Sequence, residues 1–159
     1  MTSTLIITSV DKLQKRINST VKSFKSIPGV YVSLNKTHKS IEKIFENVGI
    51  KTNKIFFIDC VTSEKAKSDV LHIAPTQLDL LSAAIRAFIK NIKEKKFLVI
   101  DAISTLLIYN SENKVAKFVK EITEYASEND VKTIAFSPKT KGEELLNKIF
   151  NFFDNVEKE

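Results

Sequence analysis

The chain has 159 residues, and 43% of them are hydrophobic. This length and composition predict one domain with a sizeable core. No stretch approaches the roughly 20 apolar residues that cross a bilayer. A single cysteine, Cys60, excludes an intramolecular disulfide, so we expect a reducing, cytoplasmic location. With only two histidines beside it, His38 and His72, the chain has no cluster with metal-ligand spacing, so we expect no metal. The net charge of +6 arises within residues 1–60, which predicts a local basic face.

Short apolar, β-branched segments alternate with longer segments of helical period, which is typical of repeated βα units and a mostly parallel sheet. The predicted strands cover residues 4–9, 30–34, 55–59, 97–101 and 133–137. Shorter candidates are residues 71–73 and 155–156. The unbroken apolar run Phe97-Leu98-Val99-Ile100 indicates a strand that is covered on both faces.

Five amphipathic segments predict the helices between these strands. The first carries an apolar stripe of Leu13, Ile17, Val21 and Phe24. The second covers residues 37–47 and should end at Gly49, and the third should begin at Pro75. The last two cover residues 113–128 and 143–153.

The first helix is also basic, and it is the candidate face for an anion or a nucleic acid. Its cationic residues are Lys12, Lys15, Arg16, Lys22 and Lys25. No aromatic residues interleave with these lysines, so we expect at most weak, sequence-blind, salt-dependent binding to nucleic acid. A solvated lysine-rich surface is the alternative.

Polar residues follow the predicted strands, at the sheet edge where open parallel sheets bind ligands. Asp101 ends the fourth strand, and further candidates for a cleft at this edge are Ser9, Asn35, Asp59, Ser104 and Ser137. Each of these residues also has an ordinary role as a turn or cap residue. For Asp101 we favour the role of a cap or hydrogen-bond acceptor at the strand end.

Residues 97–107, Phe-Leu-Val-Ile-Asp-Ala-Ile-Ser-Thr-Leu-Leu, resemble the Walker B strand and following turn of KaiC-like members of the RecA superfamily. Residues 29–34 resemble that family's second strand and residues 57–60 its third. The likeness runs from Leu5 to Val156. It implies a three-layer α/β/α domain over residues 1–159, with a RecA-like sheet of the P-loop NTPase type, five to six strands and the order 3-2-4-5-1. An archaeal source suits the resemblance.

The departures from that pattern predict a domain without ATP hydrolysis. A phosphate-binding loop needs glycines, a lysine and a Ser or Thr, but residues 9–20 contain no glycine and Asp11 places negative charge there. Asn35 and Lys36 stand where the resemblance implies paired carboxylates, the first of which activates water. A single carboxylate, Asp101, is a poor magnesium site. We therefore predict neither catalytic residues nor an ATP or Mg²⁺ cofactor.

A phosphoacceptor receiver domain is a competing interpretation, because Asp59 ends the third strand and Lys139 follows the fifth. A receiver domain, however, needs an acidic pair after the first strand, and this chain lacks that pair. A serine or cysteine hydrolase is also disfavoured, because no nucleophile elbow surrounds Ser9, Ser33 or Ser137 and no histidine falls at a matching strand end.

Three functions stay open. The first is a pseudo-ATPase module that binds a protein partner or itself, with residues 106–109 as a candidate contact, although we expect these residues to be buried within the domain. The second is a weak nucleic-acid binder, and the third is a residual nucleotide switch that uses Lys12 or Lys15.

Overall fold

The computed structural model describes residues 3–61, 70–139 and 143–159. These residues contain one sheet of seven strands, and every neighbouring pair of strands runs parallel. The strands are β1 Ser3–Thr8, β2 Gly29–Ser33, β3 Ile55–Asp59, β4 Val70–His72, β5 Lys96–Asp101, β6 Val131–Pro138 and β7 Asn155–Lys158. Because all strands run the same way, their carboxyl ends meet at one edge, the carboxyl edge, and their amino ends at the opposite edge.

The strand order is β4-β3-β2-β5-β6-β1-β7. When β1, β2, β3, β5 and β6 are numbered 1 to 5, their order is the expected 3-2-4-5-1. The first and last residues of these five strands differ from the predicted ones by at most two positions. Both shorter candidates also form strands, β4 and β7, at the two outer positions, so the sheet has seven strands rather than five or six. The receiver alternative would require the order 2-1-3-4-5, which this sheet does not have.

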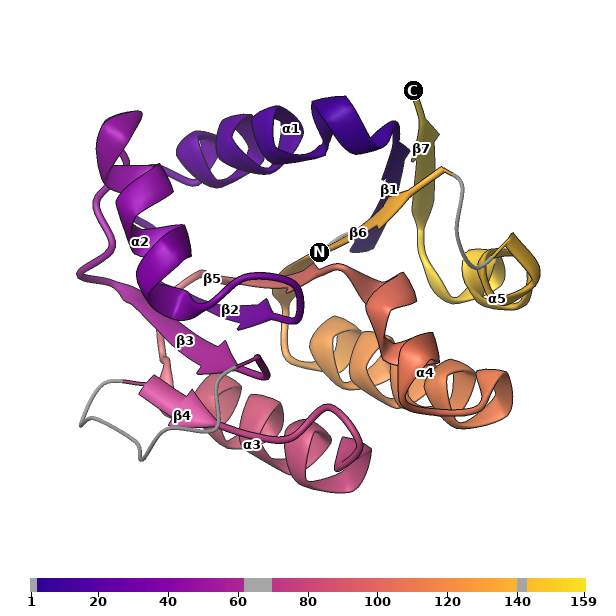
Figure 1. Cartoon of the computed structure of the whole chain (residues 1–159). Coiled ribbons are helices and arrows are strands. Elements are labelled where there is room, and N and C mark those ends of the chain that lie inside the picture. Colours follow the sequence, from indigo (N-terminus) through magenta and orange to yellow (C-terminus); the bar gives the residue numbers. More distant parts are fainter. Residues whose placement is uncertain (1–2, 62–69, 140–142) are drawn as a thin grey trace.

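Helices cover both faces of the sheet (Figure 1). On one face lie α1 Val10–Ser23 and α2 His38–Asn47, and on the other lie α3 Leu78–Asn91, α4 Glu112–Glu128 and α5 Glu143–Ile149. Two short 3₁₀ helices, η1 Ile103–Ile108 and η2 Phe150–Phe152, follow β5 and α5. The three-layer α/β/α class is therefore confirmed. No helix in the described residues combines the length and the apolar character that crossing a membrane requires.

Two helix ends differ from the sequence prediction. The third helix begins at Leu78, not at Pro75, because the Gln77 amide donates to the carbonyl of Ala74 and closes a turn over Pro75 and Thr76. The last helix gives way at Phe150 to a 3₁₀ turn. Gly49 follows Val48, the C-cap of α2, with a φ of +79°, so the predicted stop is confirmed.

The core is divided by the sheet into two apolar clusters. Against α1 and α2, the largest fully buried side chains are Tyr31, Phe45, Phe97 and Phe136. Against α3, α4 and α5, the cluster is aliphatic, with Leu98 and Ile100 of β5 at its centre. Alternate residues of β5 thus serve both clusters, as its unbroken apolar sequence indicated.

Gly29 occupies a position that has no room for a side chain. A Cβ atom at residue 29 would lie 2.4 Å from the Phe97 ring, and that ring stacks on Phe24 with 4.5 Å between centroids. The start of β2 and the first residues of β5 can approach each other in this way only with glycine at residue 29.

We predict that Gly29→Ala lowers the free energy of unfolding by about 1–3 kcal/mol, since the added methyl group must displace a buried ring. Urea denaturation measures the change, with Ser26→Ala on the adjoining exposed loop as the control that stays within about 0.5 kcal/mol of wild type. Equal stability of both variants would contradict the packing described.

Candidate functional site

The connection between β1 and α1 is a single residue. β1 ends at Thr8, α1 begins at Val10, and only Ser9 lies between them. Asp11 stands in the first turn of α1, where hydrogen bonds from Ser9 and from its own backbone amide lower the pKa of its carboxyl group. An ionised carboxylate therefore stands at the positive end of this helix, and no loop is present that could enclose a phosphate.

Three polar residues lie side by side across the centre of the carboxyl edge. Ser33, the last residue of β2, pairs in register with Asp59 of β3 on one side and with Asp101 of β5 on the other. Neighbours in a parallel sheet point to the same face, so this row points to the face covered by α1 and α2. The Ser33 hydroxyl donates to the carbonyl of Lys36.

Asp101 accepts a hydrogen bond from a buried tyrosine. The Tyr31 hydroxyl lies 2.6 Å from Asp101 Oδ2, and only 3% of Asp101 is exposed. Burial raises the pKa of the Asp101 carboxyl group, and the Tyr31 hydrogen bond and the charge of Lys36 oppose this only in part. Burial and the neighbouring Asp101 raise the pKa of Tyr31 as well, so Tyr31 remains a neutral donor. The Asp101–Ala102 peptide bond is cis.

Asp59 is fully buried and has several donors of its own. Its Oδ2 lies 3.0 Å from the His38 amide and 2.8 Å from His38 Nδ1, and its Oδ1 accepts from the Val61 amide at 2.8 Å. The ring of His38 meets that of His72 edge-on, with centroids 5.5 Å apart. Asp59 therefore joins β3, the start of α2 and the segment after β3.

His38 is a site residue that the sequence analysis did not single out. The available signal was its position directly after the helix cap Thr37, whose side chain accepts from the Ser40 amide. Next to Asp59, Cys60 is buried, and burial together with the Asp59 charge raises the pKa of its thiol to about 12. Cys60 is thus a packing residue rather than a nucleophile. Among the described residues no group of three His, Cys, Asp or Glu side chains could hold a metal ion.

The other strand-end residues are only partly brought together. Asn35 is exposed and accepts a hydrogen bond from Thr105, the neighbour of buried Ser104 in η1. Ser137 follows the register partner of Asp101 by one residue, so it points to the opposite face, and its hydroxyl donates to the carbonyl of Pro138. Ser9 lies two strands from Asp101. Of the predicted cleft residues, Asp59 and Asp101 flank Ser33 at the centre of the edge, whereas Asn35 contacts the segment after β5, through Thr105.

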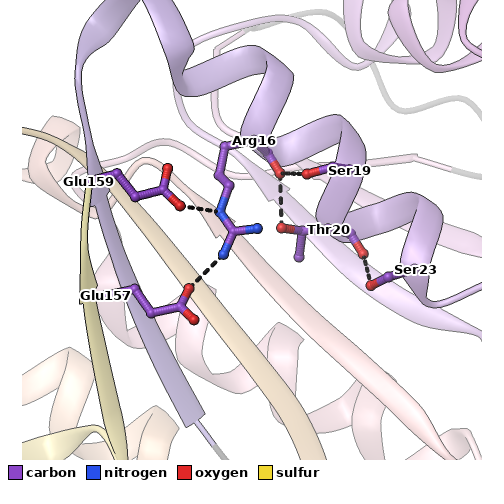
Figure 2. A network of polar contacts seen from close by, with 6 residues as sticks. All are labelled: Arg16, Ser19, Thr20, Ser23, Glu157 and Glu159. Carbon is purple, nitrogen blue, oxygen red and sulfur yellow. Dashed lines mark hydrogen bonds and ion pairs between the residues drawn. The ribbon is translucent and has the colours of Figure 1, made fainter.

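The basic residues of α1 divide into three sets. Arg16 is engaged within the domain: its Nη2 lies 2.6 Å from Glu157 Oε2 and its Nε lies 3.0 Å from Glu159 Oε1, which ties β7 to α1 (Figure 2). Lys12 and Lys15 are exposed near the carboxyl edge. Lys22 and Lys25 lie at the other end of α1, near the amino edge.

A family model described as "Protein of unknown function (DUF835)" matches residues 14–150. The chain belongs to the DUF835 family. No curated protein matches this DUF835 chain. Among solved structures, a KaiC-like protein from the hyperthermophilic archaeon Pyrococcus horikoshii superposes with a TM-score of 0.70 at 18% identity, over 98% of this chain and 69% of that one.

Two further Pyrococcus horikoshii proteins resemble the DUF835 chain in structure. An uncharacterized protein in complex with an unknown peptide has a TM-score of 0.75 at 11% identity, over 99% of this chain and 76% of that one. A third protein has a TM-score of 0.64 at 10% identity, over 99% of this chain and 80% of that one. At these identities the likeness shows the fold. The DUF835 chain has the KaiC-like fold that residues 29–34, 57–60 and 97–107 indicated.

We predict that Asp101→Asn makes stability less sensitive to pH. A carboxyl group whose pKa is raised by folding contributes stability below its ordinary pKa near 4 and loses it as pH rises through the raised value. Asparagine keeps an acceptor for Tyr31 but cannot ionise. The free energy of unfolding of the variant relative to wild type should therefore increase between pH 4 and pH 7. Urea denaturation at several pH values measures this difference, and a difference that falls with pH would contradict the account.

Proposed function

We propose that this DUF835 domain is a non-catalytic KaiC-like module that binds a protein partner at the carboxyl edge of its sheet. The observation that carries the proposal is the exposure of two large apolar residues at the end of η1, the 3₁₀ helix that follows β5. Ile108 is 70% exposed and Tyr109 is 50% exposed, although Leu106 in the same turn is fully buried. The expectation that residues 106–109 are buried as a whole is therefore wrong for Ile108 and Tyr109.

Other exposed apolar side chains belong to the same edge. Val10 follows β1 and is 65% exposed, Val61 follows β3 and is 43% exposed, and Leu80 stands in the first turn of α3. The ends of β1 and β3 are each two strands from β5, which is about 10 Å at the usual strand spacing. A contiguous protein segment can contact several of these residues at once, and burying them would stabilise the complex.

The polar groups of the edge support a binding role rather than hydrolysis. The connection at Ser9 is too short for a phosphate loop, and the two buried carboxylates, Asp59 and Asp101, already accept hydrogen bonds from within the domain. Where paired carboxylates would be expected, the chain has exposed Asn35 and half-buried Lys36, whose Nζ lies 2.5 Å from Gln14 Oε1. We propose that neither ATP nor Mg²⁺ is a cofactor. A structural neighbour in complex with an unknown peptide is consistent with a peptide-like partner.

The test uses peptides selected from a displayed random library against the intact chain, with affinities then measured by fluorescence anisotropy. We expect selected peptides to be rich in apolar residues and Ile108→Ser to weaken their binding about tenfold, which is the effect of one large apolar contact. Val48→Ser is the matched control, because Val48 is 39% exposed and follows α2 at the amino edge.

Peptides that bind Ile108→Ser and Val48→Ser equally well, or a selection without enrichment, would contradict the proposal. Sedimentation equilibrium on the same variants tests whether the partner is a second copy. In that case Ile108→Ser, and not Val48→Ser, shifts the chain toward the monomer.

A further inference from the structure

A cavity of about 380 Å³ lies at the amino edge, away from the carboxyl edge. It lies between the end of α1, the segment after α2 and the first residues of β3 and β5, on the side of the molecule where α1 and α2 both end (Figure 1). Its volume falls at the lower end of the usual range for small-molecule sites. The cavity shares no residue with the proposed protein-binding edge.

Four lysines line this cavity: Lys22, Lys25, Lys51 and Lys54. All four side chains are exposed, and among the described residues no acidic side chain lines the cavity. Two lysines come from the end of α1 and two from the segment that follows α2, so the folded chain gathers cations from separate parts of the sequence. Their charges add at the cavity mouth and attract an anion.

The floor of the cavity is apolar. Phe97 and Ile50 are almost completely buried at its base, and Ile27 and Ile55 are half-buried at its sides. Phe97 is held in place by its stacking on Phe24 and by the lack of a side chain at Gly29. A ligand must therefore offer an apolar body to the floor and negative charge to the rim.

Lys25 occupies an unusual backbone position beside the cavity. It follows the helix cap Phe24 with a φ of 55°, the left-handed conformation that glycine usually supplies after a helix. A lysine at this position places a cation at the rim although the backbone favours glycine. Backbone conformations of this kind are concentrated at functional sites.

We infer that the amino-edge cavity binds a small organic anion, one that joins a flat apolar body to a phosphate or carboxylate group. The apolar body would contact Phe97 and Ile50, and the anionic group would lie among Lys25, Lys51 and Lys54. Lysine suits this task as a mobile point charge that adjusts to the anion. The site is independent of the proposed protein-binding edge.

The probe is 1-naphthyl phosphate, titrated into the ¹⁵N-labelled chain at low salt and followed by amide chemical shifts. The usual affinity per atom of a ligand of this size leads us to expect a Kd of about 0.5 mM, with shifts centred on Ser26, Gly49 and Asn53. Inorganic phosphate and 1-naphthol, each offering one half of the ligand, should bind at least about tenfold more weakly. Lys25→Glu/Lys54→Glu should also weaken binding by at least about tenfold.

Lys12→Glu/Lys15→Glu is the matched control, since it changes the net charge equally at the other end of α1. It should alter the Kd by less than about twofold. Equal loss in both double variants would show general charge attraction and overturn the inference. Inorganic phosphate binding as tightly as the probe, or no saturable shifts with the probe, would overturn it as well. None of these variants touches Ile108 or Tyr109, so the failure of this site leaves the peptide experiment unaffected.

Discussion

The single-residue connection between β1 and α1 decides what the carboxyl edge of this domain can bind. Because α1 begins directly after Ser9, no chain is left between β1 and the helix to wrap a phosphate. Asp11 in the first turn adds negative charge at that position. The domain has a KaiC-like fold, and a single residue connects β1 to α1 where that fold could carry a phosphate-binding loop.

The centre of the same edge is occupied by internal hydrogen bonds. Tyr31 satisfies Asp101, and His38 with the Val61 amide satisfies Asp59. Leaving such a buried group without a partner would cost about 1–3 kcal/mol, or more for a charged one. These bonds join β2, β5, β3 and the start of α2 into one framework. The exposed residues Ile108 and Tyr109 therefore stand on a supported edge, which is the physical basis for proposing a binding surface there.

Local patterns in the sequence predict most of the fold. Apolar runs give the strands, helical stripes give the helices, and Gly49 gives a helix end. The start of α3 is less predictable, because Pro75 is also suited to the turn that it forms. A proline can therefore indicate either the first turn of a helix or a separate turn before the helix, and only the three-dimensional structure of the following residues decides between them.

The sites are harder to predict because their residues come together only on folding. His38 and Asp59 are 21 positions apart, and no local pattern relates them. Lys51 and Lys54 join Lys22 and Lys25 only when the ends of α1 and α2 meet. Arg16, expected on a basic face, instead binds Glu157 of β7 and Glu159 just after it, 141 and 143 positions away. The position of Asp101 at the end of β5, by contrast, follows directly from its strand.

The central proposal, that the carboxyl edge does not bind a nucleotide, is tested most directly by titrating Mg²⁺–ATP into the ¹⁵N-labelled chain. Amide chemical shifts separate the two edges, so ATP that enters the amino-edge cavity is recognised as such. The account predicts no saturable shifts at Ser9–Lys12 or Asp101–Thr105. Saturable shifts at those residues that disappear in Asp101→Asn would contradict it and would assign a nucleotide-dependent function to this edge.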